Sequence, residues 1–235
     1  MTHTAPDLPQ AFEKLSGGDV VGAIGAVVAA SDAGAALDNL DQLCKHAYRE
    51  LKNIRAMTAI ASEAIRFGLR CADVAGDAES ARGYKSRVRA IAYNAGANCW
   101  PGWGDPVEIT AADIARGIKL AERNAQLVKE LELGGKELGG SFWLLGALQM
   151  AAAQASPAIA HFVAAQKAFH DAGLPVYEEM ARGYAALAVK TQPGAHSGDA
   201  PSLTTILESL RAMESREAQF FAEQLVTADR IFSSR

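Results

Sequence analysis

Apolar residues recur every three or four positions along most of this chain, and no segment alternates strictly between apolar and polar residues. The clearest example follows Thr110, where one apolar stripe faces away from a row of charged and amide side chains. That stripe consists of Ile114, Ile118, Ala121, Ala125 and Val128. A spacing of three and four is the period of an amphipathic α-helix, whereas a half-buried strand alternates with a period of two. The pattern therefore predicts an all-α protein.

Turn-forming residues divide this pattern into separate helices. Gly17-Gly18, Gly76-Asp77 and Gly134-Gly135 interrupt it, because glycine favours the left-handed backbone conformation at which helices end. Thr110 and Asp113 have the spacing of a capping box, which marks the start of a helix. The expected helices cover about 8–15, 20–30, 35–52, 55–74, a segment ending near 99, 110–134, 136–154, 157–171 and 176–190.

A polar loop rich in proline and glycine, residues 192–202, separates the last part of the chain from the rest. Beyond it an apolar stripe continues almost to the end, with no glycine or proline. The stripe consists of Leu203, Ile206, Leu210, Met213, Phe220, Leu225, Ala228 and Ile231. We predict one long helix from Ser202 to Phe232, kinked near Glu214-Ser215. Such a helix must bury its stripe, either by capping the final hairpin, which we favour, or against a second subunit. The expected organisation is a helical array over 1–191, a loop over 192–202, and a terminal helix or helices over 203–235.

Small and aromatic residues recur at similar helical spacing in three segments. The first segment carries Phe142, Leu145, Gly146, Ala158, Phe162 and Ala165, the second Gly18, Asp19, Ala23, Ile24, Val27 and Ala30, and the third Tyr177, Met180, Ala181 and Tyr184. This pattern resembles the tetratricopeptide-repeat superfamily in a degenerate form. The resemblance implies antiparallel helical hairpins stacked as an α-α superhelix. Residues between about 35 and 133 lack the signature, and an irregular helical bundle is the alternative.

In the superfamily that the chain resembles, the first helix of each hairpin lines a concave groove. The resemblance places two sets of residues there: Trp143, Leu144, Ala147 and Met150 in one hairpin, and Glu178, Glu179, Arg182 and Ala186 in the next. The superfamily's clamp for a terminal carboxylate uses Lys and Asn, which these positions lack. An apolar stretch beside a charged one suits an amphipathic helix, from a partner or from the chain itself. Alternatively, Trp143 and Leu144 pack against the neighbouring hairpin.

The segment WPGWGDP, residues 100–106, is the most unusual local sequence, and its prolines and glycines exclude an α-helix. Trp100, Trp103 and Asp105 are candidate binding residues, because tryptophan is enriched at recognition surfaces and loops often carry function. The same two tryptophans can instead form a lid over the end of a hairpin. We favour the lid and predict that at least one indole is mostly buried within its own chain.

Charge and composition exclude some classes of function. The formal net charge is −4, which gives no electrostatic basis for binding nucleic acid. The basic segment 81–90 is expected to be a solvated helix face. No apolar run approaches the roughly 20 residues that a membrane-spanning helix needs, and the first ten residues lack the features of a signal peptide. Cys44, Cys71 and Cys99 form no CxxC pair and favour a reducing, cytoplasmic location.

No familiar catalytic arrangement is present in the sequence. Phosphate-binding glycine loops and a GxSxG nucleophile motif are both missing. His46 and Glu50 are four residues apart, but two groups do not make a metal site. Cys99 would need a base such as His46 close by to act as a nucleophile. We therefore predict no cofactor, no metal and no catalytic residue.

The resulting hypothesis is a protein-interaction or scaffold module that binds a peptide or partner helix in an apolar groove. One alternative is a helical-bundle enzyme or small-ligand-binding protein with a pocket between helices, recognisable by converging polar groups with shifted pKa values. The other is a structural protein that forms homo-oligomers, including a homodimer through the C-terminal helix.

Overall fold

The computed structural model of the protein describes residues 8–191 and 201–233. Within these residues every regular element is helical, with eleven α-helices, one short 3-10 helix and no strand. The all-α prediction is therefore confirmed. The described residues fall into two compact units, one made of 8–99 and 106–131 and the other of 100–105, 132–191 and 201–233. The predicted division at the loop 192–202 stays a prediction, because residues 192–200 lie outside the described part.

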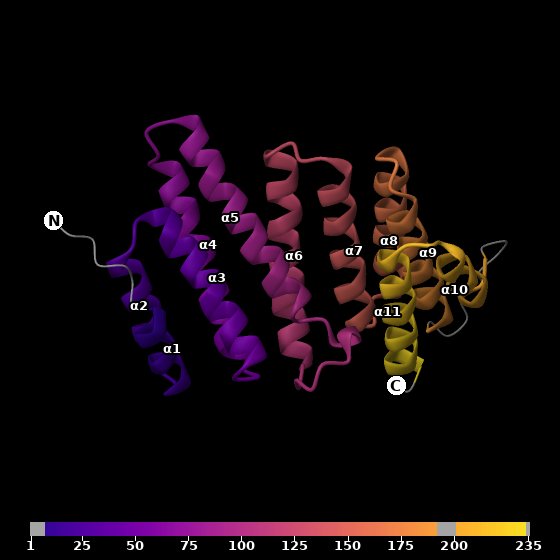
Figure 1. Ribbon diagram of the computed structural model, residues 1–235, viewed down its shortest axis with the longest axis horizontal. Helices are drawn as coiled ribbons and strands as arrows, with labels where there is room; N and C mark the ends of the chain where they lie inside the picture. Colours follow the sequence, from indigo (N-terminus) through magenta and orange to yellow (C-terminus); the bar gives the residue numbers. More distant parts are fainter. Residues whose placement is uncertain (1–7, 192–200, 234–235) are drawn as a thin grey trace. The chain divides into compact units, whose positions relative to one another are not determined.

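The first unit consists of six consecutive helices (Figure 1). They are α1 (Leu8–Ser16), α2 (Val20–Ala30), α3 (Ala33–Arg49), α4 (Ile54–Asp73), α5 (Ala78–Ala97) and α6 (Ala111–Glu130). Each helix contacts the next one along the chain, and the contacts α1–α3, α2–α4, α3–α5 and α4–α6 also occur. Their apolar stripes meet in a core that includes Leu37, Leu40, Met57, Ile60 and Leu127, all fully buried.

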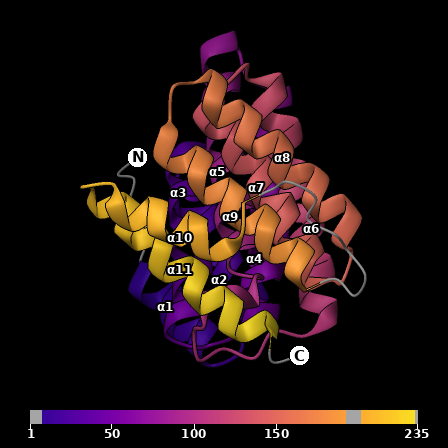
Figure 2. The ribbon, with the colours of Figure 1, turned by 90° about the vertical axis from the view of Figure 1, so that its right-hand side faces the viewer.

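The second unit contains a short 3-10 turn and five α-helices. They are η1 (Pro101–Trp103), α7 (Gly135–Ala151), α8 (Ala155–Asp171), α9 (Pro175–Lys190), α10 (Leu203–Ala212) and α11 (Arg216–Ser233). Helices α7, α8 and α9 pack side by side in chain order. Helices α10 and α11 both pack on α9, and α11 also contacts η1 (Figure 2).

Three hairpin turns have the same construction. The turns at 17–19, 152–154 and 172–174 each place their middle residue in the left-handed region: Gly18 (φ +86°), Ala153 (φ +57°) and Gly173 (φ +67°). In each turn the following residue donates its N–H to the carbonyl five positions earlier, with N···O distances of 2.8 to 3.0 Å. This is the Schellman ending of a helix, and the next helix starts within two residues. One short motif therefore reverses the chain three times.

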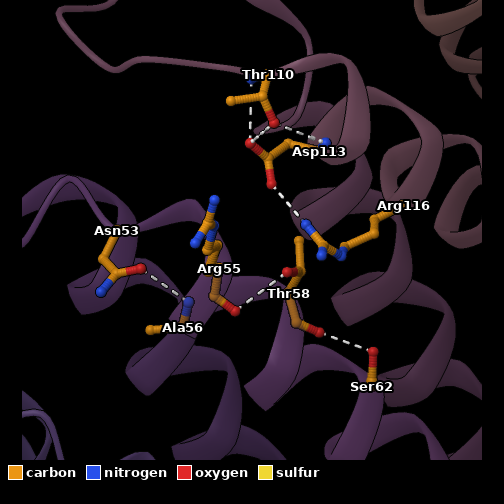
Figure 3. Close-up of polar contacts among 8 residues, drawn as sticks. All are labelled: Asn53, Arg55, Ala56, Thr58, Ser62, Thr110, Asp113 and Arg116. Atoms are coloured by element: carbon orange, nitrogen blue, oxygen red, sulfur yellow. Dashed lines mark hydrogen bonds and ion pairs between the residues drawn. The ribbon is translucent and has the colours of Figure 1, made fainter.

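Side-chain caps fix most of the helix starts in the first unit. Asp19, Asp32, Asn53 and Asp77 each accept a hydrogen bond from a backbone N–H in the first turn. At α6 the capping box predicted from the sequence is present (Figure 3). The Asp113 carboxylate accepts from the Thr110 N–H at 3.1 Å and from the Thr110 hydroxyl at 2.6 Å, while the Asp113 N–H donates back to that hydroxyl. The helix boundaries thus follow local chemistry.

The hairpin of α7 and α8 is the segment that best matched the repeat pattern. Leu145, Gly146, Ala158, Phe162 and Ala165 are buried in it, as predicted, and Phe142 is half-buried. Glycine permits the close approach of the two helices. A Cβ atom built on Gly146 would lie 2.8 Å from the Phe162 ring, and one on Gly139 would lie 2.4 Å from the Phe169 ring.

Two of the predicted boundaries are wrong. The C-terminal segment is not one kinked helix, because it breaks completely at the place where the kink was predicted. Met213 is extended (φ −78°, ψ 117°), and the Ser215 hydroxyl accepts from the Ala218 N–H at 3.0 Å, which starts α11. Likewise, α6 does not continue to Gly134. It ends at Glu130, and Glu132 turns the chain at φ +49°.

Candidate interaction site

The face of α9 that receives α11 is apolar and closely fitted. Helix α11 buries Phe221, Leu225, Ala228 and Phe232, which follow one another at spacings of four, three and four and so form one stripe. The Phe221 ring meets the Tyr177 ring of α9 edge to face, with 5.2 Å between centroids. Leu225 lies over Gly183, where an added Cβ would come within 2.5 Å of its Cδ1. Close packing of this kind requires glycine at position 183.

Charged side chains hold both ends of α11 against the same unit. Near its start, Glu217 accepts a hydrogen bond from the Tyr177 hydroxyl, and the Lys136 ammonium lies 4.8 Å from the centroid of the Tyr177 ring. Burial and the contact with Glu217 raise the pKa of Tyr177, which keeps the phenol protonated and able to donate. Near its end, Asp229 accepts from the Lys190 ammonium at 2.7 and 2.9 Å.

An aromatic cluster lies where η1, α7, α9 and α11 meet. Trp100 is its centre and is fully buried, with ring centroids 4.9 Å from Trp103, 5.7 Å from Trp143, 5.6 Å from Tyr184 and 6.2 Å from Phe232. Most of these pairs are edge to face, the arrangement that aromatic quadrupoles prefer. The cluster joins a loop, two helices of the array and the last helical turn of the described chain.

Residues 100–105 of the WPGWGDP segment are accordingly a structural part of this unit. The prediction that at least one indole is mostly buried is confirmed by Trp100, whereas Trp103 is half-buried and Asp105 is exposed. Gly104 turns the chain at φ +74° against α11, where an added Cβ would lie 3.0 Å from the Thr227 methyl carbon. These contacts favour the lid interpretation, and a recognition role for Trp103 and Asp105 stays a prediction.

The residues expected to line a groove fall into two groups, an apolar set on α7 and a charged set on α9. Trp143, Leu144, Ala147 and Met150 are all buried within the chain, and the Trp143 ring contacts Trp100, Trp103 and Tyr184. Packing against a neighbouring element, the alternative left open for Trp143 and Leu144, is what Trp143 does here. Its ring is covered by η1 and α9.

The charged members of the predicted groove form pairs of their own. Glu179 is buried and accepts from Arg182 at 2.7 Å, one turn further along α9. Glu178 is half-buried and contacts the His170 imidazole at 3.0 Å and the Gln166 amide at 3.5 Å. Glu179 and Arg182 thus pair with each other on α9, whereas the partners of Glu178 lie on α8, so the three residues do not gather around a common centre.

Three further groups capable of acid–base or nucleophilic chemistry, the Cys99 thiol, the His46 imidazole and the Asp113 carboxylate, lie in the first unit. Burial raises the pKa of the Cys99 thiol to about 12, so it stays protonated and is a poor nucleophile near neutral pH. His46 stacks on Phe12 at 4.5 Å between centroids. Desolvation raises the pKa of Asp113, but the hydrogen bonds from Thr110 and the Arg116 guanidinium, at 2.8 Å, lower it more, and the net shift is downward. Figure 3 shows this carboxylate enclosed between its donors.

The basic side chains of α5 also form contacts within the first unit. Arg82 donates to the Leu131 carbonyl at 2.6 Å, Lys85 pairs with Glu130 at 3.2 Å, and Arg87 pairs with Asp38 at 3.0 Å. These contacts link α5 to α3 and α6 within the first unit. No grouping of three or more His, Cys, Asp or Glu side chains suited to a metal ion occurs in the described part of the chain. In the same residues, none of the helices has the length and apolarity needed to cross a bilayer.

The sequence alone did not identify the residues that hold α11 against α9. Gly183, Lys190, Glu217 and Asp229 were not singled out. The predicted stripe included Phe220 and Ile231, whereas the structure buries Phe221 and Phe232, the next position in each case, and leaves Phe220 exposed. The useful signal was present, because a carboxylate lies near each end of α11 and a glycine lies within α9. Their partners lie 39 and 40 residues away, beyond the range of any helical spacing rule.

Fold and site together define an all-α protein of packed antiparallel hairpins, in which an amphipathic C-terminal helix lies against an apolar and aromatic face. No protein-family model, curated protein or solved structure matches this chain.

Proposed function

We propose that the protein is a tetratricopeptide-like interaction module that binds an amphipathic helix on the face formed by α9 and η1. Helix α11 takes that position within the chain. The observation that supports this proposal is the packing of α11 against α9 and η1. In helix-in-groove recognition, an amphipathic helix lays its apolar face into an apolar groove. Helix α11 has such a face, its Leu225 packs closely on Gly183, and a carboxylate near each of its ends accepts a hydrogen bond from a residue of α9.

Several features of the fold support the tetratricopeptide-like part of this proposal. The Schellman turn is repeated at 17–19, 152–154 and 172–174, and small residues occupy the crossing of α7 and α8. In the first unit each helix contacts both the next helix and the one after it, as stacked hairpins do. The free thiols Cys44, Cys71 and Cys99 support action in a reducing compartment such as the cytoplasm.

The apparent affinity of such a face for a partner depends on how often α11 leaves it. If the face is free in only a small fraction of molecules, the measured dissociation constant rises in inverse proportion to that fraction. Weakening α11 without altering the receiving face should therefore strengthen binding in trans. Leu225→Ala does this, because Leu225 is fully buried, and removing such a side chain typically costs about 2–5 kcal/mol.

The test uses a labelled peptide with the sequence Arg216–Ser233 and the full-length chain. We expect the peptide to bind the Leu225→Ala chain at least about thirtyfold more tightly than the unmodified chain, as measured by fluorescence anisotropy. The matched control is Val226→Ala, the next position on α11, which is 42% exposed and should leave binding unchanged. Absence of peptide binding to a folded Leu225→Ala chain would refute the proposal.

Self-association is a second candidate, favoured by one observation. Phe220 on α11 is 55% exposed, and its ring centroid lies 5.7 Å from that of the neighbouring Phe221. An exposed aromatic ring on an amphipathic helix is a frequent anchor at protein interfaces. Light scattering of the full chain would reveal a dimer, and Phe220→Ser should convert it to a monomer.

A further inference from the structure

The two acidic contacts of α11 lie near opposite ends of the helix. Glu217 precedes the buried stripe, and Asp229 lies between its last two members, Ala228 and Phe232. Glu217 and Asp229 are twelve positions apart, which is about 18 Å along an α-helix. Glu217 meets the Tyr177 hydroxyl near Lys136, and Asp229 meets Lys190. The donors come from the starts of α7 and α9 and from the last residue of α9, so the receiving face carries one cation near each end.

An apolar stripe alone does not fix how a helix lies on a face. The helix could slide by one turn or reverse its direction while still burying a similar area. Charges at both ends remove that freedom, because a slide of one turn moves each carboxylate about 5 to 6 Å from its partner. Electrostatic complementarity of this kind contributes more to specificity than to raw affinity.

We infer that the partner of this face is an acidic amphipathic helix that carries two carboxylates twelve positions apart, one before its apolar stripe and one near the end of the stripe, and binds in the place and direction of α11. This inference rests on the proposed function and names its partner class. The Lys190 side chain is 51% exposed and Asp229 is 28% exposed, so each contact is partly screened by solvent. Each is expected to change binding by about two- to fivefold, and the two together by roughly tenfold.

The experiment compares two peptides on the full-length Leu225→Ala chain. One has the sequence Arg216–Ser233, and the other carries Glu217→Lys and Asp229→Lys. We expect the reversed peptide to bind roughly tenfold more weakly at about 0.05 M salt, and the difference to shrink at about 0.5 M, where charges more than about 4 Å apart are screened. Equal binding of the two peptides at low salt would overturn the inference and leave the proposed function standing.

Charge reversal on the receiving face provides the matched control. In a chain that carries both Leu225→Ala and Lys190→Glu, a peptide with Asp229→Lys alone should bind more tightly than the peptide with the unmodified sequence. A preference for the unmodified peptide on this chain would contradict the pairing of position 229 with position 190. Failure of every peptide to bind would instead count against the proposed function.

A measurement on the unmodified chain covers the case in which Leu225→Ala does not fold. Excess peptide of the unmodified sequence should speed amide hydrogen exchange along α11, because a displaced helix loses its protection. The reversed peptide should do so less at equal concentration. Equal acceleration by the two peptides would overturn the inferred charge preference, and no acceleration by either would overturn the displacement of α11.

Discussion

Ala153 adopts a left-handed backbone conformation, at φ +57°, in the turn between α7 and α8. A side chain in this region costs about 1 kcal/mol, which glycine avoids. Ala153→Gly should therefore raise the free energy of unfolding by about 0.5–1 kcal/mol in urea denaturation. The matched control is Gly173→Ala in the turn between α8 and α9, where an added Cβ would meet nothing within 4 Å. It should lose about 1 kcal/mol, and an unchanged stability in both variants would contradict the strain argument.

Tyr184 presents a different problem at the residue scale. It is fully buried, and its hydroxyl has no hydrogen-bond partner among the described residues. Burial raises the pKa of this phenol well above its usual value, so the group stays neutral. Because an unpaired buried hydroxyl costs free energy, Tyr184→Phe should leave stability unchanged or raise it by about 1 kcal/mol.

The comparison for Tyr184 is Tyr177, whose hydroxyl donates to Glu217. Tyr177→Phe should lower the free energy of unfolding by about 1 kcal/mol, because it removes a hydrogen bond to a charged group. Thermal unfolding of both variants measures the contrast. A clear loss of stability in Tyr184→Phe would show that its hydroxyl has a partner after all.

At the scale of elements, the crossing of α7 and α8 depends on Gly146. A leucine there would force its Cβ to within 2.8 Å of the Phe162 ring and 3.1 Å of the Ala158 carbonyl oxygen. Gly146→Leu should cost about 1–3 kcal/mol through overpacking, measured by urea unfolding. Gly25→Leu on α2 is the control, since an added Cβ there meets nothing within 4 Å, and it should not destabilise. Equal effects at the two positions would argue against a close crossing.

The cap of α6 should respond to pH. The pKa of Asp113 is lowered in the folded state, so this carboxylate stabilises the fold above its unfolded value of about 3.9, and the stabilisation is lost as the pH falls through the folded pKa. Asp113→Asn should cost about 1–2 kcal/mol at pH 7 and less at pH 3, as measured by urea unfolding. Thr110→Val should act in the same direction. A constant difference between the Asn variant and the unmodified chain over this range would rule out the ionic contribution.

The elements differ in how well the sequence predicts them. The start of α6 was predictable because Thr110 and Asp113 cap it through contacts three residues apart. The break before α11 was not predicted as a break, because the apolar stripe continues across it whether or not the helix does. Ser215 was the available signal, since serine is a preferred helix cap. The left-handed conformation of Ala153 was also not predicted, because alanine rarely occupies such a position.

At the scale of the whole molecule, the sequence predicted that the C-terminal segment must dock but not how. The contact between Lys190 and Asp229 spans 39 residues, and that between Tyr177 and Glu217 spans 40. Helical spacing rules act over one or two turns, so they identify an apolar face without identifying what covers it. The same limit explains why Trp143 and Leu144 were assigned both to a groove and to packing. Only the placement of η1 and α11 distinguishes these alternatives.

Removing the segment after Ser202 would show how much α10 and α11 contribute to the stability of the fold. Helix α11 covers Gly183 with Leu225 and stacks Phe232 on the fully buried Trp100, so its loss would expose an apolar and aromatic surface. We expect the truncated chain to aggregate or lose stability, with tryptophan emission shifted to longer wavelength as Trp100 gains solvent contact. Phe232→Ala in the full chain should give a smaller shift in the same direction. A truncated chain that stays folded, soluble and monomeric by light scattering, with unchanged emission, would show that α10 and α11 are dispensable to the fold.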